Sequence, residues 1–110
     1  GVRPDSSLAV AAGLEVTPRG GIVVDDQQRT SAPNVYAVGD AAESYSLITG
    51  APLWRPLGST ANKMGRIAGD AITGGNLTHR GILGTGIVRV FELAVGHTGL
   101  SLDPPTLIRR

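Results

Sequence analysis

The sequence contains no cysteine among its 110 residues, and this absence narrows the classes of protein to which it can belong. A framework of disulfide bonds and a metal site built from thiolates are both excluded within the chain. The two histidines, His79 and His97, have no second ligand at the spacing of a metal site. We therefore expect no metal-binding residues, and we expect both histidines to be surface residues or interior residues with hydrogen-bond partners.

Aromatic residues, basic clusters and long apolar runs are also scarce. Aromatic residues make up 4% of the chain, whereas glycine occurs 16 times, a composition typical of tight turns and close backbone approaches. The ten Lys and Arg residues are dispersed and the net charge is +1, so nucleic acid is not an expected partner. No apolar run reaches the roughly 20 residues that span a bilayer, and residues 1–4 lack the pattern of a signal peptide. We therefore expect a cytoplasmic protein without a membrane partner.

The length of 110 residues is that of a single domain. Neither end, however, resembles the end of a natural protein. The chain begins without Met, and residues 107–110 follow soon after an apolar strand-like run. We expect both ends to be internal to a longer protein.

A short helix is predicted near the amino terminus. Ser6 or Ser7 is a suitable N-cap, small apolar residues follow, and Gly13 is a suitable stop.

A longer helix is predicted to begin at Ser59 or Thr60, either of which can cap it, and to extend to about residue 72. Gly65 and Gly69, four residues apart, would let this helix approach a neighbour closely. The spacing of its apolar residues predicts one buried face, formed by Met64, Ile67, Ala68, Ala71 and Ile72.

Short apolar runs bounded by turn residues predict strands. Residues 35–38 are typical of a buried strand in a parallel sheet, and Gly39-Asp40 follows at its carboxyl end. The Gly-rich residues 74–85 are the candidate linker. The other predicted strands are residues 14–16, 22–24, 87–93 and 94–100.

Gly39-Asp40 is the candidate ligand-binding position, because ligands of α/β proteins bind at the carboxyl edge of a parallel sheet. Gly39 permits close approach of the backbone, and the carboxylate of Asp40 is an acceptor suited to the hydroxyls of a sugar or polyol. Taken alone, the dipeptide is more often a simple turn in which Asp40 caps the following residues.

The segment around this dipeptide resembles the second flavin-binding motif of the FAD-dependent pyridine nucleotide-disulfide oxidoreductases. It reads Thr30-Ser31-Ala32-Pro33-Asn34-Val35-Tyr36-Ala37-Val38-Gly39-Asp40. Residues 1–4, 20–25, 56–66 and 81–100 are also similar to that family, in the family's order. The greatest similarity is to the branch of coenzyme A-disulfide reductases, NADH oxidases and NADH peroxidases.

The resemblance implies a role for two parts of the chain in binding FAD. Asp40 would bond the ribityl chain, and the helix that starts near Ser59 would point at the pyrimidine edge of the isoalloxazine. The unpaired N–H groups and partial positive charge of that helix end would stabilise negative charge on the reduced flavin. An ordinary capped amphipathic helix fits the same residues. The implied cofactor-binding residues are Thr30, Gly39, Asp40, Ala41, Leu57, Gly58, Thr60 and Ala61.

The resemblance also implies that the start of the long helix approaches the disulfide substrate. Asn62 lies where some relatives carry a substrate-contacting residue, and Lys63 and Arg66 are placed to meet the phosphates of coenzyme A. A solvated helix face is the alternative for both basic residues. Trp54 and Tyr45 would either cover the flavin, form a dimer contact, or anchor their loop by aromatic packing.

The implied fold class is α/β, consisting of the C-terminal segment of a Rossmann-like FAD-binding domain followed by the start of an α+β dimerisation domain. Residues 1–77 would be the returning segment of the FAD-binding domain, and residues 78–110 the linker and first strands of the dimerisation domain. The phosphate-cradling Gly-x-Gly-x-x-Gly motif is absent, because the glycines of residues 81–86 have other spacings. We expect no catalytic residue in the chain, weak or no binding of FAD by it alone, and a homodimer formed through its unpaired strand.

The resemblance implies that the parent enzyme passes a hydride from NAD(P)H through FAD to a disulfide, oxygen or peroxide, with coenzyme A disulfide as one candidate substrate. The redox cysteine would lie in the amino-terminal region. Two alternatives stay open: a ferredoxin or rubredoxin reductase without a redox cysteine, and a stand-alone interaction module. Sequence upstream of the chain would decide between them.

Overall fold

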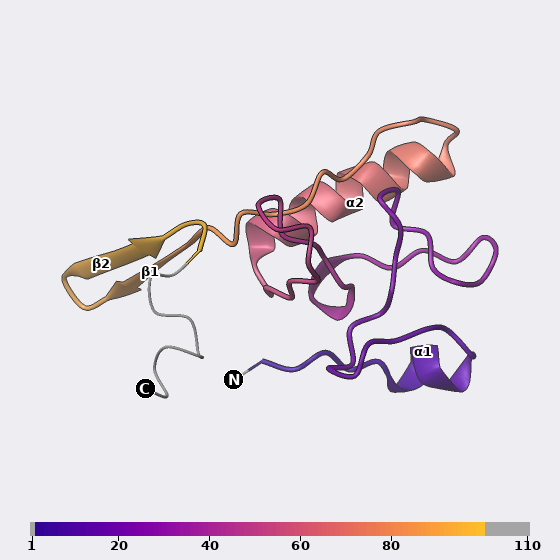
Figure 1. The fold of residues 1–110 in the computed structure, drawn as a ribbon, viewed down its shortest axis with the longest axis horizontal. Coiled ribbons are helices and arrows are strands. Elements are labelled where there is room, and N and C mark those ends of the chain that lie inside the picture. The colour runs from indigo at the N-terminus through magenta and orange to yellow at the C-terminus, as the bar shows by residue number, and fades with distance from the viewer. Residues whose placement is uncertain (1, 101–110) are drawn as a thin grey trace.

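The computed structural model describes residues 2–100, so Gly1 and residues 101–110 of the second predicted domain lie outside the described part. Its elements in chain order are α1 (Ser7–Ala11), the 3-10 helix η1 (Gly39–Ala41), α2 (Gly58–Ile72), β1 (Gly86–Val90) and β2 (Leu93–His97). Figure 1 shows a body built from α2 and the loops beside it, with the β1–β2 hairpin projecting from one end. The described residues therefore form a small α/β structure. No helix among them combines the length and apolar character needed to cross a membrane.

Helix α2 matches the predicted long helix at its carboxyl end and differs at its start. The helix ends at Ile72, as predicted, and Gly74 follows at a φ of +89°. It begins one residue earlier than predicted, at Gly58, and Leu57 precedes it in extended conformation with no side-chain cap. The predicted capping roles of Ser59 and Thr60 are therefore wrong.

The core of the body is the buried face of α2. Met64 is 1% exposed and forms a cluster with Val24, Ala37 and Ala42. The buried residues of the helix are Thr60, Met64, Ala68 and Ala71. Ile72, predicted to belong to this face, is 63% exposed instead.

Gly65 and Gly69 were predicted to bring a neighbouring element close to α2. A Cβ atom placed on either residue would have no atom of the described chain within 4 Å. The prediction of a close neighbour is therefore not met within residues 2–100.

The predicted strands before α2 do not form. Residues 14–16, 22–24 and 35–38 contribute only isolated β-bridges, which join Val16 to Ile22, Ile22 to Ala42 and Arg29 to Tyr36. Val35 and Val38, predicted to be buried, are exposed. A central parallel strand requires a paired strand on each edge, and the described chain offers single-residue bridges in place of such strands.

Helix α1 confirms the predicted short helix and its end near Gly13, but not the predicted serine N-cap. Ser6 makes no side-chain capping bond. Asp5 takes this role, because its Oδ1 atom accepts hydrogen bonds from the backbone N–H of Ser7 at 3.2 Å and from the Ser7 hydroxyl at 2.7 Å. The helix ends at Ala11, shortly before Gly13, whose φ is +78°.

The β1–β2 hairpin corresponds to the two strands predicted over residues 87–93 and 94–100, but the bend between them comes earlier than predicted. The two strands pair antiparallel, from Gly86 opposite His97 to Val90 opposite Leu93. Residues 91–92 form the turn between them, and Phe91 has a φ of +53°. An apolar run therefore turns back on itself, although Phe is an unusual residue at positive φ.

Residues 79–82 of the predicted linker are bonded to the body, and we call this segment the strap. The backbone N–H of His79 donates to the carbonyl of Asp26 at 2.7 Å. Farther along, Ile82 donates to the carbonyl of Tyr45 at 2.8 Å and accepts from the N–H of Leu47 at 2.9 Å. The path from α2 to the hairpin is therefore held on the body by backbone hydrogen bonds.

Candidate functional site

The structure brings together two parts of the predicted flavin site, the Gly39-Asp40 turn and the first turn of α2. Gly39 has a φ of +77°, a conformation that glycine adopts readily and other residues rarely do. A Cβ atom on Gly39 would lie 3.7 Å from the Cβ of Ala61 in α2. η1 therefore packs directly against the amino-terminal part of α2, and we call this contact the η1–α2 junction.

Asp40 lies at this junction with its side chain exposed. No described residue donates a hydrogen bond to its carboxylate, so the alternative role of Asp40 as a cap is not observed. Its backbone carbonyl accepts a hydrogen bond of 2.7 Å from the indole Nε1–H of Trp54. Trp54 therefore ties its own loop to the turn that carries Asp40.

The amino terminus of α2 presents unpaired hydrogen-bond donors. The bond from the N–H of Ala61 to the carbonyl of Leu57, at 3.0 Å, is the first of the helix. The N–H groups of residues 58–60 precede that bond, and no side chain caps them. This end of the helix also carries the positive end of the helix dipole. The junction therefore combines an acceptor, the Asp40 carboxylate, with donors for which residues 2–100 supply no partner.

Two other residues predicted to bind the cofactor are engaged elsewhere. The Thr30 hydroxyl donates to the carbonyl of Val35 at 2.9 Å and so closes its own loop. The carbonyl of Ala41 accepts a hydrogen bond from the N–H of Ile22 at 2.8 Å. Both residues shape the segments on either side of residues 35–38, and their polar atoms are used within the chain.

The basic residues of α2 line a groove with part of the strap. Lys63 and Arg66, one turn apart, meet Arg80 around a groove of about 360 Å³ whose apolar residues are Ile67 and Leu77. Asn62 is exposed and is not among the residues that line this groove. Arg80 was missed by sequence reasoning, since nothing in its spacing links it to a helix that ends eight residues earlier.

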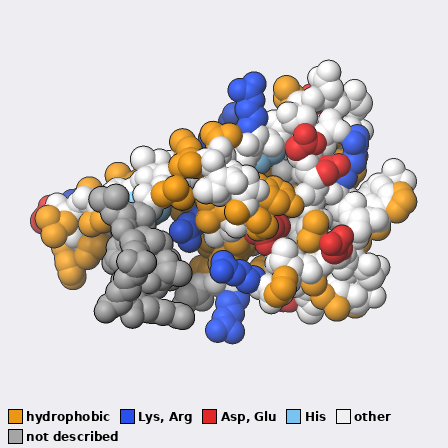
Figure 2. All heavy atoms as spheres, in the orientation of Figure 1, with side chains coloured by type: hydrophobic (Ala, Val, Ile, Leu, Met, Phe, Trp, Pro, Cys, Tyr) orange, Lys and Arg blue, Asp and Glu red, His pale blue; other side chains and the backbone are white. Residues whose placement is uncertain are grey.

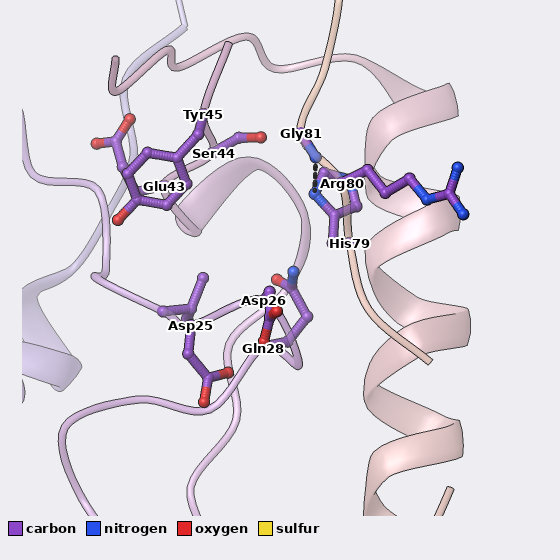
Figure 3. A pocket seen from close by; sticks show the side chains of 10 residues that line it. Asp25, Asp26, Gln28, Glu43, Ser44, Tyr45, His79, Arg80 and Gly81 are labelled. Atoms are coloured by element: carbon purple, nitrogen blue, oxygen red, sulfur yellow. Dashed lines mark hydrogen bonds between the residues drawn. The ribbon is translucent and has the colours of Figure 1, made fainter. Parts of the chain in front are cut away.

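A second, smaller cavity lies beneath the strap, between three separate segments (Figure 3). Its volume is about 130 Å³, and Gln28, Ser44 and His79 are among the residues that line it. The Nδ1 atom of His79 accepts a hydrogen bond of 3.3 Å from the N–H of Gly81, whereas its Nε2 atom is buried without a partner in the described chain. Burial, together with the positive charge of Lys63, lowers the pKa of His79 below its ordinary value of 6.5. The expectation of an interior histidine with hydrogen-bond partners is thus met at Nδ1 of His79 and not at Nε2 within the described residues.

Comparison with known proteins identifies the family. The family described as pyridine nucleotide-disulphide oxidoreductase matches residues 1–54. The chain is 41% identical over 101 residues to the NAD(P)H sulfur oxidoreductase (CoA-dependent) of Pyrococcus furiosus, covering 92% of this chain and 23% of that protein. It is 37% identical to an NADH oxidase of Methanocaldococcus jannaschii, covering 99% of this chain and 24% of that protein.

A solved structure agrees with this result. The NAD-dependent persulfide reductase from A. fulgidus superimposes with a TM-score of 0.89 at 40% identity, covering 94% of this chain and 19% of that one. The chain thus spans about a quarter of the length of the curated relatives it matches. These similarities show that the chain belongs to the FAD-dependent pyridine nucleotide-disulfide oxidoreductases, in the branch of coenzyme A-disulfide reductases, NADH oxidases and persulfide reductases.

Proposed function

We propose that this chain supplies one side of the flavin site in a longer enzyme, which passes a hydride from NAD(P)H through FAD to a disulfide, oxygen or peroxide acceptor. The observation that carries the proposal is the η1–α2 junction, where the turn bearing Asp40 packs against the first turn of α2. The activities named for the relatives, a CoA-dependent sulfur oxidoreductase and an NADH oxidase, support the same reaction class.

The polar groups at the junction fit FAD chemically. The carboxylate of Asp40, exposed and without a donor in the described chain, would accept hydrogen bonds from the ribityl hydroxyls. The free N–H groups of residues 58–60 would face the pyrimidine edge of the ring and stabilise negative charge there. Gly39 matters because its φ of +77° is one that other residues rarely adopt, and this conformation places its backbone against Ala61. When bound, FAD accepts the hydride and passes the electrons onward.

The groove beside α2 is the proposed substrate side. Lys63, Arg66 and Arg80 place three positive charges around an apolar floor. Guanidinium groups bind phosphate in a bidentate manner, and an apolar floor suits an organic chain attached to that phosphate. A coenzyme A disulfide has both parts. Asn62, exposed on the same helix, would contact the substrate outside the groove.

The proposal assigns residues 1–77 to the FAD-binding domain of the parent and residues 78–110 to the start of its dimerisation domain. The chain alone would then bind FAD weakly and lack activity, because it has no Gly-x-Gly-x-x-Gly motif to hold the diphosphate. A cysteine in the amino-terminal region of the parent would identify a thiol-based reductase. Its absence would favour the alternative, a ferredoxin or rubredoxin reductase.

Replacing Asp40 in the complete enzyme tests the flavin role. Asp40→Ala removes a charge-assisted hydrogen bond that contributes about 1.5–3 kcal/mol, so FAD affinity should fall about 10-fold to 150-fold. Asp40→Asn keeps the size and one acceptor but loses the charge, so its affinity for FAD should lie between that of the parent and that of Asp40→Ala. FAD dissociation constants, measured by fluorescence titration of the apoenzyme, check both values.

The matched control is Asp5→Ala, which removes a carboxylate whose partner among residues 2–100 is Ser7, at the start of α1. This variant should bind FAD as tightly as the parent. If Asp40→Ala lowers the melting temperature while both Asp40 variants keep the parent's FAD affinity, Asp40 has a structural role and the proposal fails.

A further inference from the structure

The cavity beneath the strap collects buried polar atoms that the described chain leaves without partners. Side-chain atoms of this kind in residues 2–100 are Gln28 Oε1, Ser44 Oγ and His79 Nε2, and all three residues line this one cavity. Gln28 is 1% exposed and Ser44 is 3% exposed. Buried polar atoms are nearly always hydrogen-bonded to protein or to ordered water, so three such atoms around one cavity point to an occupant.

The backbone of Gln28 adopts a strained conformation. Gln28 has a φ of +66°, which is unfavourable for a residue with a side chain. Two backbone bonds maintain this conformation: its N–H donates to the carbonyl of Asp25 at 3.1 Å, and its carbonyl accepts from the N–H of Ala37 at 3.1 Å. In Figure 3 the Gln28 amide lies toward His79, whereas the Arg80 side chain extends away across α2.

The hydrogen-bonding character of the three atoms defines the chemistry of the occupant. The N–H of Gly81 donates to Nδ1 of His79, so the neutral ring carries its proton on Nε2 and offers a donor to the cavity. Gln28 Oε1 is an acceptor, and the Ser44 hydroxyl can donate or accept. The occupant must therefore accept from His79 and donate to Gln28.

We propose that this cavity permanently binds a small cluster of ordered water molecules that bridge Gln28, Ser44 and His79. Water is both donor and acceptor, and a buried water typically makes about three hydrogen bonds. A volume of about 130 Å³ is large enough for more than one molecule.

The water cluster fastens the strap to the body. Gln28 and Ser44 belong to the body, whereas His79 belongs to the strap, whose backbone bonds to Asp26 and Tyr45 flank the cavity. The cluster thereby joins the segment that precedes the β1–β2 hairpin to the loops on both sides of η1, through Gln28 before it and Ser44 after it. This inference is independent of the flavin role of Asp40.

The test compares two buried serines in the complete protein. The Ser46 hydroxyl accepts hydrogen bonds from the N–H groups of Ile48 and Thr49, both at 3.2 Å, so Ser46→Ala removes bonds that are known. If water occupies the cavity, Ser44→Ala also removes a bond, and both variants should melt about 2–4 °C below the parent. If the cavity is dry, Ser44→Ala relieves an unpaired buried hydroxyl and should melt above the parent, which would overturn the proposal.

A high-resolution crystal structure of the unmodified protein decides the question without any variant. We expect isolated density within hydrogen-bond distance of Gln28 Oε1, Ser44 Oγ and His79 Nε2. Density continuous with a side chain from another part of the protein, density for a larger or charged molecule, or an empty cavity would each overturn the proposal. Amide exchange gives a local readout: in Ser44→Ala the N–H of His79 should exchange faster, whereas in Ser46→Ala it should not.

Discussion

The body and the β1–β2 hairpin use their apolar side chains in opposite ways. In the body, Met64 is 1% exposed within a cluster that residues 22–64 complete by themselves. In the hairpin, Ile87 is 80% exposed and Phe91 is 88% exposed. Figure 2 shows the resulting hydrophobic surface where the hairpin projects from the body. The body is therefore stabilised by contacts within the described chain, whereas the described residues leave the apolar side chains of the hairpin uncovered.

This contrast has a physical basis. A two-stranded hairpin alone is marginally stable in water, because it has no third layer to cover its side chains. The exposed pair of Arg89 with Glu92, at 3.3 Å, contributes little to its stability. Within the described residues, the hairpin has the backbone pairing of its two strands and its covalent connection to the strap. We expect that contacts which bury its apolar side chains would stabilise it further.

The largest expected effect concerns the body. Met64→Ala should lower the free energy of unfolding by about 2–5 kcal/mol, because it leaves a cavity in the core. Ile72→Ala, on the same helix but 63% exposed, should change it by less than about 0.5 kcal/mol. Urea denaturation followed by circular dichroism measures both. Equal effects of the two variants would show that the core does not control the stability of the body.

The next effect concerns the hairpin. Burying an isoleucine side chain contributes about 1.5–3 kcal/mol, so Ile87→Lys should weaken self-association about 10-fold to 150-fold while leaving the unfolding of the body unchanged. Arg89→Ala, on the same strand, is the control and should have a small effect. Sedimentation equilibrium gives the dissociation constants. A parent protein that stays monomeric at high concentration would remove the basis for a homodimer formed through this surface.

The smallest effect concerns the strap that joins the two regions. Because the folded pKa of His79 is lowered, the unfolded state binds the proton more strongly, and stability should fall as the pH drops below about 6.5, the ordinary value. The loss should level off below the folded pKa. The charged residues near the ring are Lys63 on α2 and the cavity-lining Asp25, Asp26, Glu43 and Arg80.

His79→Gln should flatten this part of the profile of melting temperature against pH. The control His97→Gln, in an exposed strand, should not. An unchanged slope in His79→Gln would mean that other groups cause the pH dependence.

Some elements followed from local sequence and others did not. The end of α2 was predicted correctly because Thr73-Gly74 stops a helix through the conformational preferences of a few residues. Its start was not, because Leu57 enters the helix without a side-chain cap. Residues 35–38 have the composition of a buried strand, but a strand also needs partners, and composition does not supply them. The bend between the last two predicted strands was placed too late in the sequence, because Phe91 is an unusual residue for a turn with positive φ.

The sequence by itself determined the family, since the ordered motifs of this chain are readable without coordinates and the relatives agree with them. It also determined where the backbone needs glycine, as at Gly39. Only the tertiary structure decided that Arg80 joins Lys63 and Arg66, and that Gln28, Ser44 and His79 surround one cavity. The physical reason is range: helix periodicity and φ preferences act over a few residues, whereas these contacts depend on the path of the whole chain and on the hydrogen bonds that hold the strap in place.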